Sequence, residues 1–251
     1  MSVSISFGRK ISLKSGLINN SSSKDLIKKN IIYEIKSPQI SNPFQENFDP
    51  KSKIESLVKT NFCIIKLLNS YNLPIKINID ILENLKQGHL KTTSDIAAKI
   101  YSALPSDLKN EVNIFDLKTA AIMHDYGKIL IPSEILNKKG KLNAEEREIM
   151  QLHSELGYEL LKNSGLSERV LKLIKYHHQN LQKSGYPHVN SDFDFGIDFQ
   201  ILNIADKYTA LREKRCYKNP LAKYETLEII AKDVRQGLIS QEVYTALVKS
   251  V

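Results

Sequence analysis

The stretch His124-Asp125-Tyr126-Gly127-Lys128 is the part of the sequence around which the rest is organised. A histidine beside an aspartate offers an imidazole nitrogen and a carboxylate whose two oxygens can bridge two cations. Other residues of the same chemistry lie before and after this pair: His89, His153, His177, His178 and Asp206. Together these side chains supply seven nitrogen and oxygen ligands, which is about the number that two ions use. The sequence therefore predicts a cluster of metal ligands.

Apolar residues recur at helical spacing through most of the chain, and no strand-like alternation interrupts them. We therefore expect an all-α fold, a helical bundle. The expected helices cover residues 54–71, 79–85, 94–104, 115–126, 132–136, 143–162, a segment beginning at Ser167 and ending with His177 and His178, and residues 198–212, 221–236 and 241–248. Gln87-Gly88-His89 is expected to separate two helices, and Gly127 to end the helix that carries His124. Asn143 with Glu146 is typical of a helix-capping pair.

The first fifty residues differ in composition from the rest of the chain. Residues 1–50 are rich in Ser, Asn and Lys and poor in apolar side chains, so we expect a flexible basic tail rather than a folded segment. A short docking arm is the alternative. Residues 51–80 are interpreted as an N-terminal helical region that packs on the catalytic domain, and residues 81–251 as the catalytic domain itself.

The overall composition is that of an ordinary globular protein, with 41% hydrophobic and 25% charged residues. The sequence has no apolar run of membrane-spanning length and no signal-peptide pattern, which predicts a cytoplasmic protein without a membrane span. The net charge of +8 would attract a polyanionic nucleotide, but nucleic acid and lipid headgroups equally. No basic and aromatic stripe indicates a nucleic-acid surface, so nucleic acid is not an expected partner.

Several separate motifs carry a resemblance to a known family. They follow one another as His124-Asp125, Gly127-Lys128, Ile131-Pro132, Ile135-Leu136, Gly140, His153, Gly157, His177-His178, Gly185-Tyr186-Pro187 and Ala205-Asp206. In this order and at this spacing they resemble the HD-GYP branch of the HD-domain phosphohydrolases. The resemblance extends from about Ile81 to the C-terminus, and it is specific because so many elements agree in order.

The resemblance implies how the ligands are shared between two divalent ions. His89, His124 and Asp206 would hold one ion, and Asp125 would bridge to the other. The second ion would be held by His153, His177 and His178. A glutamate that binds a third ion in some members is replaced here by Leu85, so two ions are expected. Mixed imidazole and carboxylate ligands suit iron or manganese, and zinc is possible.

The resemblance also implies an activity, the hydrolysis of cyclic di-GMP to a linear dinucleotide and onward to GMP. A hydroxide bridging the two ions would attack the phosphorus. Asp125 and Lys128 are the expected catalytic residues, and Lys128 would stabilise the developing charge. Substrate binding is expected from Lys128, Tyr186, Arg215 and Lys218. A surface role is the alternative for the three cationic side chains, and a simple turn for Gly185-Tyr186-Pro187.

Several positions depart from the family pattern and leave alternatives open. Gln179 replaces a glutamate, Gln182-Lys183 replaces Asp-Gly, and Thr93 and Thr209 replace an arginine and an aspartate. A catalytically weak nucleotide-binding or docking module, or a hydrolase of another cyclic dinucleotide, is therefore the alternative to the enzyme. The family also associates the Gly-Tyr-Pro loop with docking to diguanylate cyclase domains, and a homodimer is a possible assembly.

Overall fold

The computed structural model describes residues 50–190, 192–214 and 219–251, and these residues form helices and connecting loops without a strand. The predicted all-α fold is therefore confirmed, whereas the expected tail of residues 1–50 lies outside the described residues apart from Pro50. The elements are α1 (Pro50–Thr60), α2 (Phe62–Ser70), α3 (Asp80–Leu85), the π-helical turn η1 (Lys86–Leu90), α4 (Lys91–Ala103), α5 (Ser106–Lys109), α6 (Ile114–Met123), the 3₁₀ segment η2 (Tyr126–Leu130), α7 (Ser133–Leu136), α8 (Ala144–Leu161), α9 (Glu168–Tyr176), α10 (Ile197–Arg212), α11 (Lys223–Arg235) and α12 (Gln241–Ser250).

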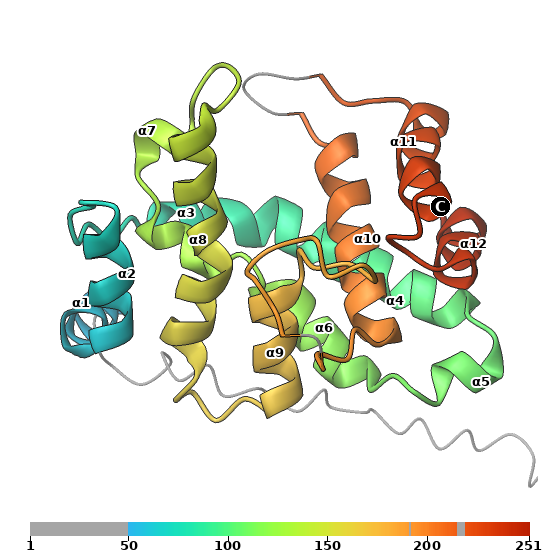
Figure 1. The fold of residues 1–251 in the computed structure, drawn as a ribbon, viewed down its shortest axis with the longest axis horizontal. Helices are drawn as coiled ribbons and strands as arrows, with labels where there is room; N and C mark the ends of the chain where they lie inside the picture. Colours follow the sequence, from blue (N-terminus) through green and yellow to red (C-terminus); the bar gives the residue numbers. More distant parts are fainter. Residues whose placement is uncertain (1–49, 191, 215–218) are drawn as a thin grey trace, which may run out of the picture. The chain divides into compact units, whose positions relative to one another are not determined.

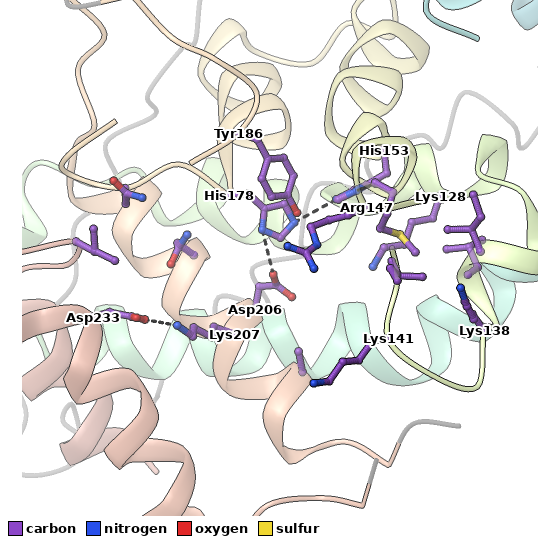
Figure 2. Close-up of a pocket in the computed structure, with 18 of the residues that line it drawn as sticks. Lys128, Lys138, Lys141, Arg147, His153, His178, Tyr186, Asp206, Lys207 and Asp233 are labelled. Carbon is purple, nitrogen blue, oxygen red and sulfur yellow. Dashed lines mark hydrogen bonds and ion pairs between the residues drawn. The ribbon is translucent and has the colours of Figure 1, made fainter. Parts of the chain in front are cut away.

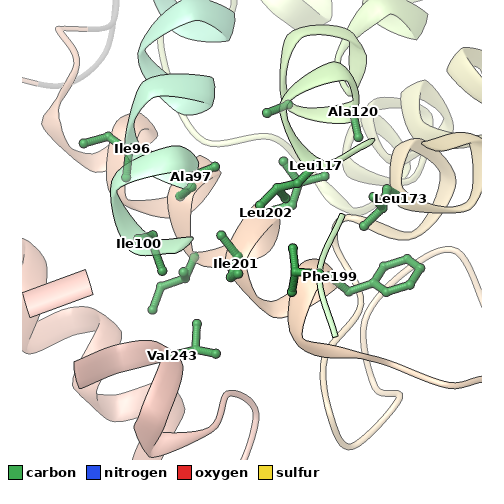
Figure 3. Close-up of a cluster of buried hydrophobic side chains, with 14 of the residues drawn as sticks. Ile96, Ala97, Ile100, Leu117, Ala120, Leu173, Phe199, Ile201, Leu202 and Val243 are labelled. Carbon is green, nitrogen blue, oxygen red and sulfur yellow. The ribbon is translucent and has the colours of Figure 1, made fainter. Parts of the chain in front are cut away.

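The main hydrophobic core surrounds α10, which is buried along much of its length. Phe199, Ile201 and Leu202 of this helix are fully buried. They pack among side chains of α4, α6, α9 and α12, as Figure 3 shows for Ile100 and Val243 and their neighbours. The core therefore packs around the apolar side of α10, while Asn203, Asp206 and Lys207 of the same helix line the pocket.

A second core lies under the N-terminal helices. Val58 of α1 and Ile64 and Leu68 of α2 are fully buried in one cluster with Leu156 of α8 and Ile129 of η2. Figure 1 shows α1 and α2 beside α8, while α11 and α12 lie at the other end of the bundle. Residues 51–70 thus cover the outer side of the helix that carries His153, which makes them part of the support for the site.

The expected single helix over residues 54–71 is wrong, because Asn61 divides it. The backbone of Asn61 is extended, and its side-chain oxygen accepts hydrogen bonds from the amides of Cys63 and Ile64 at 3.0 and 3.1 Å. An asparagine oxygen that accepts from the second and third amides after it is an N-cap, so a new helix begins there. Apolar periodicity alone could not locate this break, because the pattern continues across it.

The expected break at Gln87-Gly88-His89 is also wrong. The backbone stays helical from Asp80 to Ala103, with one wider π-helical turn at Lys86–Leu90. A glycine inside a helix costs about 1 kcal/mol, and the complete burial of Leu90, two residues after Gly88, offsets that cost. Short π-helical turns occur often at functional sites, and this one carries His89.

The helix that carries the His-Asp pair ends earlier than expected. α6 ends at Met123, His124 is its C-cap, and Asp125 has left the helical conformation. Gly127 does not end the helix; it lies in η2, where a Cβ atom would come within 1.9 Å of the carbonyl oxygen of His153. Glycine is required here because η2 packs directly on the backbone of α8.

The expected helix starts are better matched than the helix ends. Asn143 and Glu146 form a reciprocal capping box at the start of α8, and Ser167 caps α9 through the amide of Val170. α9 ends at Tyr176, however, so His177 and His178 follow the helix rather than lie within it. Both histidine motifs are therefore held where a helix ends and the chain turns away.

Candidate metal centre

All seven predicted ligands meet at one place in the bundle. They come from η1 (His89), the end of α6 (His124 and Asp125), α8 (His153), the segment after α9 (His177 and His178) and α10 (Asp206). Their nitrogen and oxygen atoms fall into overlapping groups of three in which all ligand atoms lie within 4.8 Å of one another. Side chains separated widely in sequence thus converge on a common centre.

The first group, here called the mixed group, consists of His89, His124 and Asp206. The Nε2 atom of His89 lies 3.0 Å from Oδ1 of Asp206, and that of His124 lies 3.7 Å from the same oxygen. Both rings are nearly completely buried. One carboxylate oxygen therefore faces two imidazole nitrogens across a space in which a cation would be bound by all three.

The second group, here called the imidazole group, consists of His153, His177 and His178. The Nε2 atom of His153 lies 3.3 Å from Nε2 of His177 and 3.2 Å from Nε2 of His178. The rings of His177 and His178 are 4.0 Å apart. This group contains no carboxylate of its own, so three nitrogens crowd together with little internal attraction.

Hydrogen bonds to the backbone determine which nitrogen of these rings carries the proton. The Nδ1 atoms of His124, His153 and His177 each lie 2.7 to 2.9 Å from the carbonyl oxygen three residues earlier. A carbonyl oxygen only accepts hydrogen bonds, so Nδ1 must donate. In the neutral ring the lone pair is then on Nε2, the atom that points into the centre. A second hydrogen bond that fixes the tautomer in this way is usual for histidines that bind metals.

Asp125 lies between the two groups. Its Oδ2 atom is 3.3 Å from Nε2 of His124 and 3.6 Å from Nε2 of His89, whereas Oδ1 is 3.4 Å from Nε2 of His153. The carboxylate is almost completely buried, and Lys128 donates a hydrogen bond to Oδ2 at 2.6 Å. Each oxygen thus faces a different group, which is the arrangement a bridging carboxylate needs.

The pKa values differ between the two groups. Burial lowers the pKa of His153 to about 4 and that of His178 to about 3, and it lowers the pKa of His177 as well. Burial also opposes the charge on His124, but Asp125 and Asp206 outweigh it and raise its pKa to about 10. The imidazole group is therefore neutral, the form in which histidine binds a metal, while His124 is held by its carboxylates.

Three observations agree that these residues fit divalent cations. Nε2 of His124 is completely buried and has no hydrogen-bond partner among the described residues. The Nε2 atoms of His153 and His177 both carry lone pairs and lie too close together to be neutral neighbours without a cation between them. The donor set of imidazole nitrogens and carboxylate oxygens is one that iron, manganese and zinc accept. These clusters could bind metal ions.

The loop with Gly185-Tyr186-Pro187 covers the imidazole group. The ring of Tyr186 stacks on that of His178, with centroids 4.5 Å apart. A Cβ atom at Gly185 would come within 2.1 Å of the carbonyl oxygen of His178, so only glycine allows this approach. Gln179 is fully buried beneath the loop; it accepts from the amide of Gly185 at 3.1 Å and donates to the carbonyl of Pro187 at 2.5 Å.

The centre opens into a pocket of about 980 Å³. Its walls include Lys128, His153, His178, Tyr186 and Asp206, together with basic side chains of the α7–α8 loop and α8 (Figure 2). Two of the expected substrate-binding residues, Lys128 and Tyr186, thus line the pocket. The other two, Arg215 and Lys218, lie outside the described residues.

Two residues that the sequence motifs did not indicate, Glu213 and Asn203, orient the candidate ligands. Nδ1 of His89 donates a hydrogen bond to Oε2 of Glu213 at 2.9 Å. The side-chain amide of Asn203 donates to the carbonyls of His177 and Gln179, both at 3.0 Å. Asn203 precedes Asp206 by three residues on α10, and this shared helix face was an available signal. For Glu213 no local signal existed.

The described residues form an all-helical fold whose histidine and aspartate clusters could bind metal ions beside a pocket. A family profile described as an HD domain matches residues 76–243. The chain therefore belongs to the HD-domain family, which confirms the family predicted from the motifs. None of the helices among the described residues is long and apolar enough to cross a membrane.

Comparison with individual proteins finds relatives that are phosphodiesterases by name. The chain is 43% identical over 108 residues to the 3'3'-cGAMP-specific phosphodiesterase 2 of Vibrio cholerae, covering 41% of this chain and 20% of that protein. It is 35% identical over 142 residues to a cyclic di-GMP phosphodiesterase of Thermotoga maritima, covering 56% and 38%. The chain thus spans well under half the length of these relatives.

The solved structures also contain a similar chain. The HD domain of the L. monocytogenes phosphodiesterase PgpH aligns with a TM-score of 0.47 and 18% identity, covering 69% of this chain and 95% of that one.

Proposed function

We propose that this chain is a metal-dependent phosphodiesterase that hydrolyses cyclic di-GMP to a linear dinucleotide. The observation that carries the proposal is the carboxylate of Asp125, whose two oxygens face two separate groups of ligands at the base of a pocket. Relatives named as phosphodiesterases of cyclic dinucleotides support the substrate class. The volume of about 980 Å³ is large enough for a ligand of that size.

In this proposal the mixed group would hold one divalent ion and the imidazole group the other, and the carboxylate of Asp125 would be available to both. Iron or manganese is the proposed metal, with zinc as the alternative. When bound, such a pair supplies Lewis acidity at the phosphoryl oxygens and lowers the pKa of a water nucleophile. The hydrogen bonds from Nδ1 to the backbone hold the rings ready, so little reorganisation is needed on binding.

Lys128 has two roles in this mechanism. Its ammonium donates to Oδ2 of Asp125 at 2.6 Å, which keeps that carboxylate ionised and fixes its orientation. The same side chain lines the pocket, so its positive charge would stabilise the negative charge that develops on the phosphoryl oxygens. Tyr186 closes the pocket over His178 and offers an aromatic face and a hydroxyl to the substrate.

The direct test is hydrolysis of cyclic di-GMP by protein loaded anaerobically with iron or manganese, with the products separated by chromatography. We expect a linear dinucleotide, and GMP after longer incubation. Binding without cleavage under both metals would reject the enzyme in favour of a nucleotide-binding or docking module.

Lys128→Ala should lower turnover by roughly a hundredfold and leave the metal content unchanged. Unchanged turnover would show that Lys128 has no catalytic role.

Hydrolysis of 3'3'-cGAMP is the second candidate function, because a relative of that specificity is 43% identical over 108 residues. The two substrates differ in one purine, so a panel of cyclic di-GMP, 3'3'-cGAMP and cyclic di-AMP would rank them by kcat/KM.

Three further features stay predictions: docking of diguanylate cyclase domains on the Gly-Tyr-Pro loop, a homodimer, and the division of the chain into an N-terminal region of residues 51–80 and a catalytic domain of residues 81–251.

A further inference from the structure

The pocket wall contains a cation that the proposed mechanism does not use. Arg147 lies in the second turn of α8 and lines the pocket, with its side chain pointing inward (Figure 2). It shares one face of α8 with Met150 and His153, at intervals of three residues. Six residues of helix separate it from His153, which is about 9 Å along the axis. Arg147 is therefore close to the imidazole group without touching it.

Most other cations of this pocket are already neutralised. Lys128 pairs with Asp125 at 2.6 Å, Lys138 pairs with Glu146 at 2.5 Å, and Lys207 pairs with Asp233. Among the described residues, the guanidinium of Arg147 has no hydrogen-bond or ion-pair partner. Lys141 is also unpaired, but it lies in the loop before α8. Of the described residues that line the pocket, Arg147 is thus the unpaired cation that lies on a helix. A guanidinium can bind a phosphate with two parallel hydrogen bonds.

A cyclic dinucleotide presents a charge that the metal centre alone does not satisfy. Its ring contains two phosphodiesters, and only one can lie at the ions while the other enters the pocket as a second anion. Desolvating that anion is costly unless a cation or several donors meet it. We propose that Arg147 forms a second anion subsite that binds the phosphate not being cleaved; this inference rests on the proposed function. Arg147 would then favour cyclic dinucleotides over diesters with a single phosphate.

The test compares two substrates in the metal-loaded full chain. Cyclic di-GMP carries two phosphates, whereas bis(p-nitrophenyl) phosphate carries one. Arg147→Ala should raise KM for cyclic di-GMP roughly ten- to hundredfold with little change in kcat, and leave the kinetics of the nitrophenyl diester as in the unmodified chain. Arg147→Lys should recover part of the loss, because the charge remains but the fork of donors does not.

The control is Arg235→Ala, which removes an exposed arginine of α11 that does not line the pocket. It should leave KM unchanged for both substrates. Equal losses on both substrates in Arg147→Ala, or no loss on either, would overturn the subsite. Circular dichroism and metal content of each variant would show that the comparison is between folded, loaded proteins.

Failure of the proposed function would show itself differently, in the unmodified chain. If that chain binds cyclic di-GMP without cleaving it, the hydrolase is rejected while the subsite is tested by the dissociation constant, which should rise by the same factor in Arg147→Ala. If the unmodified chain neither binds nor cleaves cyclic dinucleotides, both the function and the subsite are rejected.

Discussion

The two halves of the candidate metal centre are built on different physical principles. In the mixed group, carboxylate oxygens of Asp206 and Glu213 lie within 3.0 Å of the nitrogens of His89. A protonated His89 ring therefore neutralises much of the negative charge that a metal ion would otherwise neutralise. In the imidazole group, burial lowers the pKa values of all three rings, and none has a carboxylate within 3.0 Å. The first group is held together by its own charges, whereas the second depends on a cation to hold neutral nitrogens together.

This contrast predicts how the centre responds to the loss of its ligands. The mixed group should tolerate the loss of one imidazole, because carboxylates remain to attract an ion. The imidazole group should not, because two neutral nitrogens and one distant carboxylate oxygen are a poor site. Only the loss of Asp125 should affect both groups at once.

Asp125→Ala is therefore expected to have the largest effect. It removes the carboxylate that faces both groups, and it leaves Lys128 without its partner. We expect both ions to be lost and turnover to fall by at least about a thousandfold, with the helical content retained. Elemental analysis and circular dichroism would measure this. Asp95→Ala, which removes an exposed carboxylate of α4, is the control; two ions still bound in Asp125→Ala would disprove the bridging role.

The next largest effect should be a difference in metal affinity between His153→Ala and His89→Ala. Outer partners of metal ligands are worth roughly ten- to hundredfold in affinity, and we expect the loss of a ligand to cost at least as much. We expect His153→Ala to lower the affinity for one ion by over about a hundredfold, and His89→Ala to lower the affinity for the other ion by only about tenfold. Competition with a chromophoric chelator would resolve the two ions. Equal losses, or a greater loss in His89→Ala, would contradict the contrast between the groups.

The seven residues of the candidate centre could be singled out from the sequence, because each belongs to a short motif whose order and spacing are visible along the chain; their role as metal ligands stays a prediction. The whole set from His89 to Asp206 meets in space where the motifs indicated. The all-helical fold followed from apolar periodicity in the same way. These features are local, so a single sequence carries them.

The predictions that failed concern features that depend on where the chain turns and on partners distant in the sequence. Asn61 interrupts an unbroken apolar pattern, and Gly88 sits inside a continuous helix because packing outweighs its propensity. Glu213 is 124 residues from His89, and nothing near it marks it as a partner. The hydroxyls of Thr93 and Thr209 are buried and have no hydrogen-bond partner in the described part of the chain, and nothing in the structure explains these two replacements.

Gln179, a buried glutamine beneath the Gly-Tyr-Pro loop, sharpens the comparison, because it bonds to the backbone on both sides of Tyr186, which covers the imidazole group. Gln179 needs both its donor and its acceptor, and a carboxylate at this position could not donate to the carbonyl of Pro187. Gln179→Glu should therefore reduce the free energy of unfolding by about 2 kcal/mol and the melting temperature by roughly 4 to 8 °C. Differential scanning calorimetry of the metal-loaded protein would measure the shift.

Gln182→Glu is the matched control for Gln179→Glu. Gln182 also donates to a backbone carbonyl, that of Gln236, but its side chain is exposed, so water can replace the lost partner. The change should cost less than about 0.5 kcal/mol. If the two variants melted at the same temperature, burial of the loop contact would not be what holds Tyr186 in place.

Glu213→Gln should give the smallest effect, and it probes the mixed group alone. The amide oxygen of glutamine can still accept the hydrogen bond from Nδ1 of His89, so the ring keeps its orientation, but the negative charge is lost. Because outer-sphere partners contribute up to about a hundredfold and geometry is preserved here, we expect a loss of under about tenfold in the affinity of one ion. Chelator competition, with the phases assigned through His153→Ala, would measure it. Glu111→Gln, at an exposed position, is the control. If Glu213→Gln lowered the affinity for both ions, the two groups would be coupled through charge. The mixed group and the imidazole group would then not bind their ions independently, although they are built differently.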